Sequence, residues 1–97
     1  IAVAGAATID PDVGWVTLGH ATQITATIAA PAAGQFMVIS QSSSGTAGHT
    51  VTLTAGTFNG TNPVATFNAV DETLVLFGLS ATRYAIVANI GSVAFSG

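Results

Sequence analysis

Apolar and polar residues alternate along much of the chain, which is the pattern of strands with one buried face. The clearest examples are residues 24–28 and 50–54, where Ile, Ala, Val and Leu alternate with Thr. Residues 72–79 and 83–90 are the most hydrophobic segments, and each is predicted to form a strand. Residues 35–41 have a continuous apolar centre, which is typical of a strand buried on both faces.

Shorter strands are predicted at residues 14–19, 64–68 and 91–96. Asn59-Gly60 is a strong signal for a type I′ hairpin turn, and its flanks also fit a longer loop. No segment has apolar residues at helical spacing over two turns. Because turn signals recur about every 8–12 residues, we predict an all-β fold: a small antiparallel sandwich, jelly roll or barrel-like domain of about seven to eight short strands.

The length of 97 residues allows one domain, which we assign to residues 15–97. Residues 1–14 are small and apolar and then turn at Asp10-Pro11-Asp12, because Asp and Pro together favour turns. We interpret residues 1–14 either as an edge strand of the domain's own sheet or as an arm that docks on a neighbouring subunit.

Charged residues make up only 5% of the chain, whereas about 25% is typical of soluble domains. They are Asp10, Asp12, Asp71, Glu72 and Arg83. The apolar runs are too short for a membrane-spanning helix, which needs about 20 residues. Disorder pairs low hydrophobicity with high net charge, whereas this chain is 49% hydrophobic with a net charge of −3. Coverage by other protein chains is the remaining explanation.

The polar positions carry Thr, Ser, Asn and Gln, whose hydrogen-bonding groups are less costly to bury than charges. Without lysine, the chain also lacks the commonest protection of exposed strand edges. We therefore expect a homo-oligomer, since identical subunits usually form closed symmetric assemblies. A trimer is one of the candidate symmetries. A single positive side chain argues against nucleic-acid binding, and we expect no membrane partner.

The acidic residues do not form a recognisable site. Asp10 and Asp12 have a spacing that can contribute to a Ca²⁺ site, but full coordination takes six to eight oxygens. We interpret both pairs, Asp10 with Asp12 and Asp71 with Glu72, as turn residues. Neighbours on a strand point to opposite faces, so Asp71 and Glu72 are not expected to act together on a substrate.

His20 and His49 each lie beside a predicted turn, and the chain has no cysteine. Two histidines without clustered carboxylates are weak evidence for a metal site, so we interpret them as loop or interface residues. Only if both approached a symmetry axis could they bind an ion or respond to pH. The serines at positions 42–44 lack a nucleophile motif. We predict no catalytic residue, no metal site and no cofactor, and hence no enzyme.

Two further features have open interpretations. Arg83, the only positive side chain, is expected to pair with Asp71 or Glu72, or with a carboxylate of a neighbouring subunit. Trp15 and Tyr84 are expected to pack in the core or at an interface, and the alternative is a sugar-binding platform.

Residues 45–60 (GTAGHTVTLTAGTFNG), 65–68 (ATFN) and 89–93 (NIGSV) resemble small β-rich virion proteins of tailed bacteriophages. The resemblance covers residues 22–96. It lies in composition and pattern: Thr, Gly and Ala in alternating strands, with few charges. It implies a non-enzymatic structural protein, first of all a capsid decoration (cement) protein that stabilises the lattice of the major capsid protein. A head- or tail-fibre or receptor-binding domain is the alternative within the virion, and a bacterial adhesin or carbohydrate-binding module is the alternative outside it.

Overall fold

The structure, a computed structural model, describes residues 5–9, 14–42 and 48–97. These residues form strands and connections, with no helix among them. The strands are β1 (Gly5–Ile9), β2 (Trp15–Leu18), β3 (Ile24–Ile28), β4 (Phe36–Gln41), β5 (His49–Leu53), β6 (Val64–Phe67), β7 (Thr73–Ser80), β8 (Arg83–Ile90) and β9 (Ala94–Ser96). The prediction of an all-β chain is therefore confirmed, with nine strands in the described ranges instead of seven to eight.

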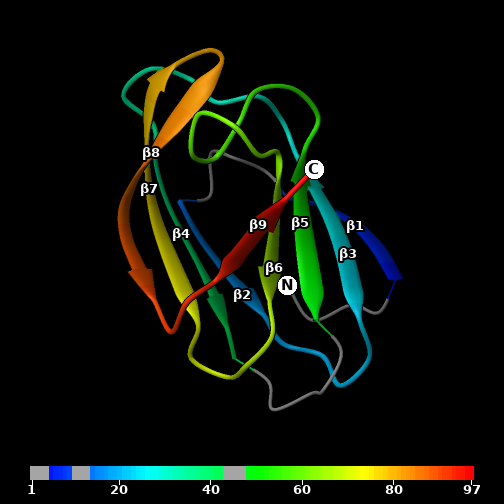
Figure 1. The fold of residues 1–97 in the computed structure, drawn as a ribbon. Helices are drawn as coiled ribbons and strands as arrows, with labels where there is room; N and C mark the ends of the chain where they lie inside the picture. Colours follow the sequence, from blue (N-terminus) through cyan, green and yellow to red (C-terminus); the bar gives the residue numbers. More distant parts are fainter. Residues whose placement is uncertain (1–4, 10–13, 43–47) are drawn as a thin grey trace.

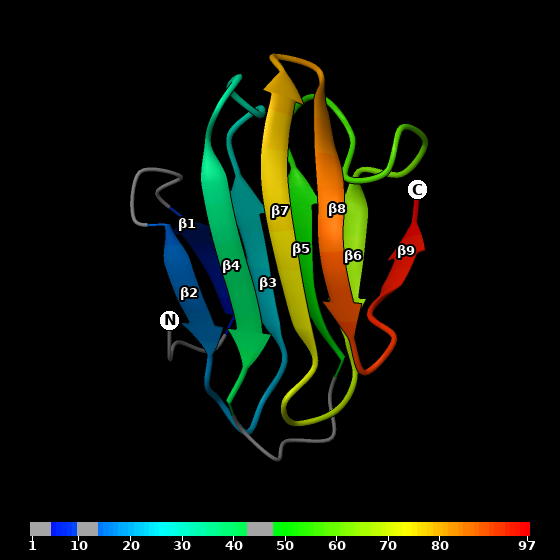
Figure 2. The ribbon, with the colours of Figure 1, turned by 90° about the vertical axis from the view of Figure 1, so that its left-hand side faces the viewer.

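The strands lie in two layers that face each other (Figure 1). One sheet has five strands in the order β1-β3-β5-β6-β9, and the other has four in the order β2-β4-β7-β8. Figure 2 looks onto the four-stranded sheet, with the five-stranded sheet behind it. The edges are β1 and β9 in one sheet and β2 and β8 in the other, so neither sheet closes on itself.

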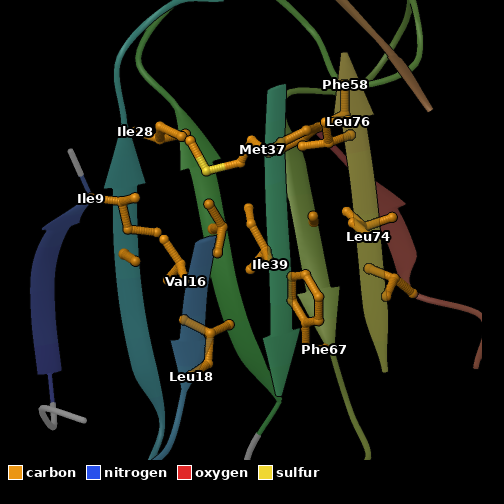
Figure 3. Packing of buried hydrophobic residues seen from close by; sticks show 14 of the residues in the cluster. Ile9, Val16, Leu18, Ile28, Met37, Ile39, Phe58, Phe67, Leu74 and Leu76 are labelled. Atoms are coloured by element: carbon orange, nitrogen blue, oxygen red, sulfur yellow. The ribbon is translucent and has the colours of Figure 1, made fainter. Parts of the chain in front are cut away.

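The prediction of antiparallel sheets was wrong for the first half of the chain. Strands β1 to β5 alternate between the two sheets, so that β1, β3 and β5 are parallel neighbours in one sheet and β2 and β4 in the other. After two successive crossings between the layers, the chain is back in the sheet from which it started and runs in the same direction as before. The opposite arrows of β3 and β4 in Figure 3 show one such reversal. Antiparallel pairing begins at β5 with β6, so both sheets are mixed.

The hairpin signal at Asn59-Gly60 belongs to a longer loop, residues 54–63, between β5 and β6. Gly60 has a φ of 87°, as a turn there requires. The Asn59 carboxamide oxygen accepts hydrogen bonds from the backbone N–H groups of Thr61 (3.0 Å) and Asn62 (2.7 Å). Asn59 therefore stabilises a turn inside the loop and does not join the strands directly.

The core lies between the sheets and is built from alternate residues of each strand (Figure 3). On β3, β5 and β7 the buried positions alternate with half-buried or exposed ones, as the period-2 pattern predicts. Loop residue Phe58 is also fully buried, and its ring stacks on that of Tyr84 at 6.1 Å between centroids. The loop therefore supplies part of the core.

Part of the segment interpreted as an arm or edge strand lies in the sheet. Gly5–Ile9 forms β1 at the edge of the five-stranded sheet, parallel to β3, and the Ile9 side chain is buried. Asp10, Pro11 and Asp12 lie outside the described residues.

Candidate functional site

The side of the four-stranded sheet that faces away from the core carries a continuous apolar area. Burial alternates along β2, β4 and β7, so every second side chain of these strands points outward. Figure 2 looks onto this side of the sheet. We define the apolar face as the outward apolar residues Trp15, Phe36, Val38, Val75, Phe77, Leu79, Ala85, Val87, Ala88 and Ile90.

The strand register aligns the outward residues in three rows across the sheet. The first row consists of Phe36, Phe77 and Ala85. The second row consists of Trp15, Val38, Val75 and Ala88, with Val87 beside it as the extra residue of a bulge. The third row consists of Thr17, Ser40, Thr73 and Ile90. Two rows are thus wholly apolar and one is largely hydroxylated.

Large side chains of the apolar face are exposed to solvent. The exposed fraction is 66% for Trp15, 57% for Val87 and Ile90, 54% for Phe36 and 53% for Leu79. The rings of Phe36 and Phe77 meet edge to face at 5.9 Å, which orders the first row. The three rows contain no charged residue. Large exposed apolar patches mark interaction sites, so the apolar face is the principal candidate for a functional surface.

The outward side of the five-stranded sheet differs sharply in chemistry. There the outward positions of β3 and β5 are all threonines, and Thr8 and Thr66 extend the array onto β1 and β6. We define the threonine face as Thr8, Thr25, Thr27, Thr50, Thr52 and Thr66. Hydroxyl groups are well hydrated, so the two sides of the molecule have different affinities for water.

Little in the amino-acid sequence predicts the apolar face. Residues 35–41 were expected to be buried on both faces, but β4 buries only one, with Met37 and Ile39 in the core and Phe36 outside. The available signal is a strand with apolar residues on both of its sides. This signal does not show whether the second side packs in a core or lies exposed at the surface. The structure distinguishes the two cases, because none of the strands in residues 5–9, 14–42 and 48–97 forms a second layer over this side of the sheet.

The two histidines, which are far apart in sequence, meet in the structure. His49 is the first residue of β5 and is fully buried, and its Nδ1 accepts a hydrogen bond from the Ile24 backbone N–H at 2.9 Å. A second hydrogen bond joins its ring to the backbone of His20. His49 thereby connects β5 to the crossing between β2 and β3, which makes it a structural residue and corrects its interpretation as a loop or interface residue.

His20 is also engaged locally. Its Nδ1 accepts a hydrogen bond from the Thr22 backbone N–H at 3.1 Å and lies 2.8 Å from the Thr22 hydroxyl. Within the described residues, no group of three or more His, Asp or Glu side chains is placed to hold a metal ion. Hydrogen bonds within the chain hold both histidines in place.

Burial of His49 makes stability depend on pH. Desolvation lowers the pKa of its imidazole below the ordinary value of 6.5, and the hydrogen bond with the His20 backbone opposes this only in part. Below pH 6.5 the unfolded chain therefore binds more protons than the folded one. The contribution of neutral His49 to the free energy of unfolding is fully present above pH 6.5. It is lost as the pH falls towards the lower pKa of the folded state, with a slope of at most about 1.4 kcal/mol per pH unit.

We expect the unfolding temperature to fall between pH 7.5 and pH 5.5, and calorimetry at constant ionic strength measures this. The variant His49→Gln should be less stable at pH 7.5 and should lose most of the slope in this range. His20→Gln, the matched control, should retain it. An equal slope in wild type and His49→Gln would show that another group is responsible.

The acidic residues that the structure describes have structural roles at one turn. Glu72 is buried, and its Oε1 accepts a hydrogen bond from the Asn68 backbone N–H at 2.6 Å. Asp71 is exposed, and its backbone N–H donates to the Gln41 carbonyl oxygen at 2.8 Å. Both are turn residues. Glu72 closes the loop and Asp71 adopts a φ of 71°, a conformation that Asp tolerates better than most residues.

Arg83 lies far from these carboxylates. On the β7–β8 hairpin, Thr73 pairs with Ile90 at one end and Ser80 with Arg83 at the other, so the turn with Asp71 and Glu72 is about 20 Å away. The expectation of an ion pair with Asp71 or Glu72 is therefore wrong, and pairing with a carboxylate of a neighbouring subunit stays a prediction. A side chain at Gly60 would meet the Arg83 guanidinium at 3.1 Å, so Arg83 lies against the 54–63 loop.

The two candidate aromatic residues have opposite environments. Tyr84 is fully buried, burial raises the pKa of its hydroxyl, and this hydroxyl donates to Gln35 Oε1 at 2.9 Å. It cannot form a sugar-binding platform. Trp15 is exposed on the apolar face beside β4. Ser42 is exposed, and residues 43 and 44 lie outside the described ranges.

No helix of the described residues is long and apolar enough to cross a membrane. Comparisons with protein-family models, with characterised proteins and with solved structures found no match.

Proposed function

We propose that this protein is a non-enzymatic structural subunit that docks on other protein subunits through its apolar face. The observation that carries the proposal is an outward sheet surface with two wholly apolar rows, no charge, and Trp15 two-thirds exposed. Water is the least favourable environment for such a surface, and covering apolar area stabilises by about 25 cal/mol per Å². Protein interfaces are likewise poor in charge and rich in aromatic residues at their centre.

The proposed setting is a bacteriophage virion, in which the protein decorates the capsid and reinforces its lattice. The supports are the resemblance of residues 22–96 to small virion proteins and a composition with 5% charged residues. The threonine face fits a solvent-facing side, because its hydroxyls are hydrated without charge. For this role we assign the two facing sheets to an open sandwich, supported by the unpaired edges β1, β9, β2 and β8.

Electron cryo-microscopy of intact particles, combined with quantitative mass spectrometry, tests this setting. We expect many copies arranged on the capsid lattice, and removal of the protein should lower the temperature at which the shell breaks. Low copy number confined to the tail would contradict decoration.

That outcome would favour the second candidate, a domain of a head or tail fibre. The specific observation in its favour is the path of the chain from β1 to β5. Successive strands alternate between the two sheets, and neighbouring strands within each sheet are parallel. Elongated solenoid proteins are built by stacking repeated units of this kind. Deletion of a fibre domain should abolish adsorption to the host and leave shell stability unchanged.

A further inference from the structure

We infer that the apolar face binds the same face of a second copy, related by a two-fold axis that runs parallel to the strands. This inference rests on the proposed function and names its partner. It follows from the order of residues within the rows: under that rotation the second row is complementary in size, and the central residues of the first and third rows face residues of their own kind.

A two-fold axis parallel to the strands and central to the sheet places β2 opposite β8 and β4 opposite β7, and it leaves each row facing itself. In the second row the largest side chain, Trp15, then lies over the smallest, Ala88, and Val38 lies over Val75. In an isologous interface each such contact occurs twice. Large residues therefore meet small ones at both margins, and equal ones meet at the centre.

The other rows match at their centres, and at the margins of the third row Thr17 faces Ile90. Phe36 faces Phe77 in the first row, which sets aromatic rings against each other. In the third row Ser40 faces Thr73, and these hydroxyls, which already bond each other at 2.9 Å within one chain, meet hydroxyls of the second copy. An axis perpendicular to the strands would instead set Trp15 against Trp15 and the aromatic row against the hydroxyl row. The parallel axis is thus the better fit.

Charge and area are consistent with a second copy as the occupant. Two identical faces can meet without like-charge repulsion because none of the three rows carries a charge. Four strands of four to eight residues span a surface of the order of 400 Å² in projection, at spacings of about 4.8 Å and 3.3 Å. Two such surfaces approach the lower limit of specific interfaces, about 1,000 Å² in total, so we expect a dimer that dissociates on dilution.

Sedimentation velocity over a wide concentration range tests the inference. Wild type should pass from monomer to dimer, and Ala88→Trp should weaken association at least about tenfold, or about 1.4 kcal/mol, because it fills the place that Trp15 of the other copy occupies. The matched control is Ala94→Trp, the same change at an exposed alanine in the outward position opposite Thr66 on the five-stranded sheet. It should associate like wild type.

The single tryptophan gives an independent readout. Trp15 emission should shift to shorter wavelength, and its quenching by acrylamide should fall, over the same concentrations at which the dimer forms. If Ala88→Trp does not fold, Trp15→Ser serves instead, with Val70→Ser in an exposed loop as its control. Trp15→Ser should also lose at least about tenfold in association.

A wild-type protein that stays monomeric, a trimer, or a dimer unaffected by Ala88→Trp and Trp15→Ser would overturn the inference. The proposed function would survive these results if the monomer or trimer still bound particles through the apolar face. Particle-bound protein in which the thiol of Val87→Cys reacts as fast as in the dilute isolated chain would contradict the proposed function itself.

Discussion

Replacing Phe58 with alanine is expected to lower the free energy of unfolding by about 3–5 kcal/mol, the usual cost of removing a buried phenylalanine. Phe58 is fully buried although it lies in the 54–63 loop, and its ring centroid lies 6.1 Å from those of both Tyr84 and Phe95. The loop is also bound to β8, because the Thr57 carbonyl oxygen accepts the Tyr84 backbone N–H at 3.0 Å. Alanine would leave a cavity that this tethered backbone cannot close.

Urea denaturation at equal protein concentration measures the loss, since oligomerisation adds to apparent stability. The control is Thr61→Ala, an exposed position of the same loop whose backbone hydrogen bond to Asn59 is unaffected. It should change the free energy of unfolding by less than about 0.5 kcal/mol. Equal effects of the two substitutions would mean that Phe58 does not belong to the core. For a domain of ordinary stability, about 5–15 kcal/mol, the expected loss is a large fraction of the whole.

The alternation of side chains located the strands well because it reflects a local requirement. A strand with one face in the core must place apolar residues at every second position, wherever its neighbours lie in sequence. The bounds predicted for residues 24–28 and 83–90 coincide with β3 and β8. Those predicted for β4 differ by one residue at one end, and those for β7 differ by one residue at each end.

Pairing partners could not be obtained in the same way. The turn residues after β2 and β3 are compatible with a hairpin within one sheet and with a crossing to the other sheet. A hairpin and a crossing differ in the long-range contacts of the strands and not in the local conformation of the turn. The sequence around the turns therefore does not indicate that β1 pairs in parallel with β3 and β2 with β4. The hydrogen bond that joins His49 to the backbone of Ile24 is a consequence of the same crossings.

The candidate surface was predicted only in outline. Scarce charge indicated that neighbours cover part of the molecule, and it did not indicate which part. Both outward sheet surfaces lack charge along their strands, yet one carries threonines and the other Trp15, Phe36 and Val87. Only the assignment of strands to sheets separates these surfaces, because residues far apart in sequence share each one.

If other protein chains cover the apolar face in the assembled state, thiol labelling detects this coverage without interference, because the chain has no cysteine. Val87→Cys places a thiol at an exposed position of the apolar face, and Thr25→Cys places one at an exposed position of the threonine face. In the dilute isolated chain both should react with a maleimide at comparable rates.

In the assembled protein, as the concentrated oligomer or the intact particle, Val87→Cys should react at least about tenfold more slowly, as expected when opening the interface costs about 1.4 kcal/mol or more. Thr25→Cys should react at its dilute rate in the concentrated oligomer. Equal labelling of Val87→Cys in the dilute and the assembled protein, with assembly verified by sedimentation, would show that other chains do not cover the apolar face.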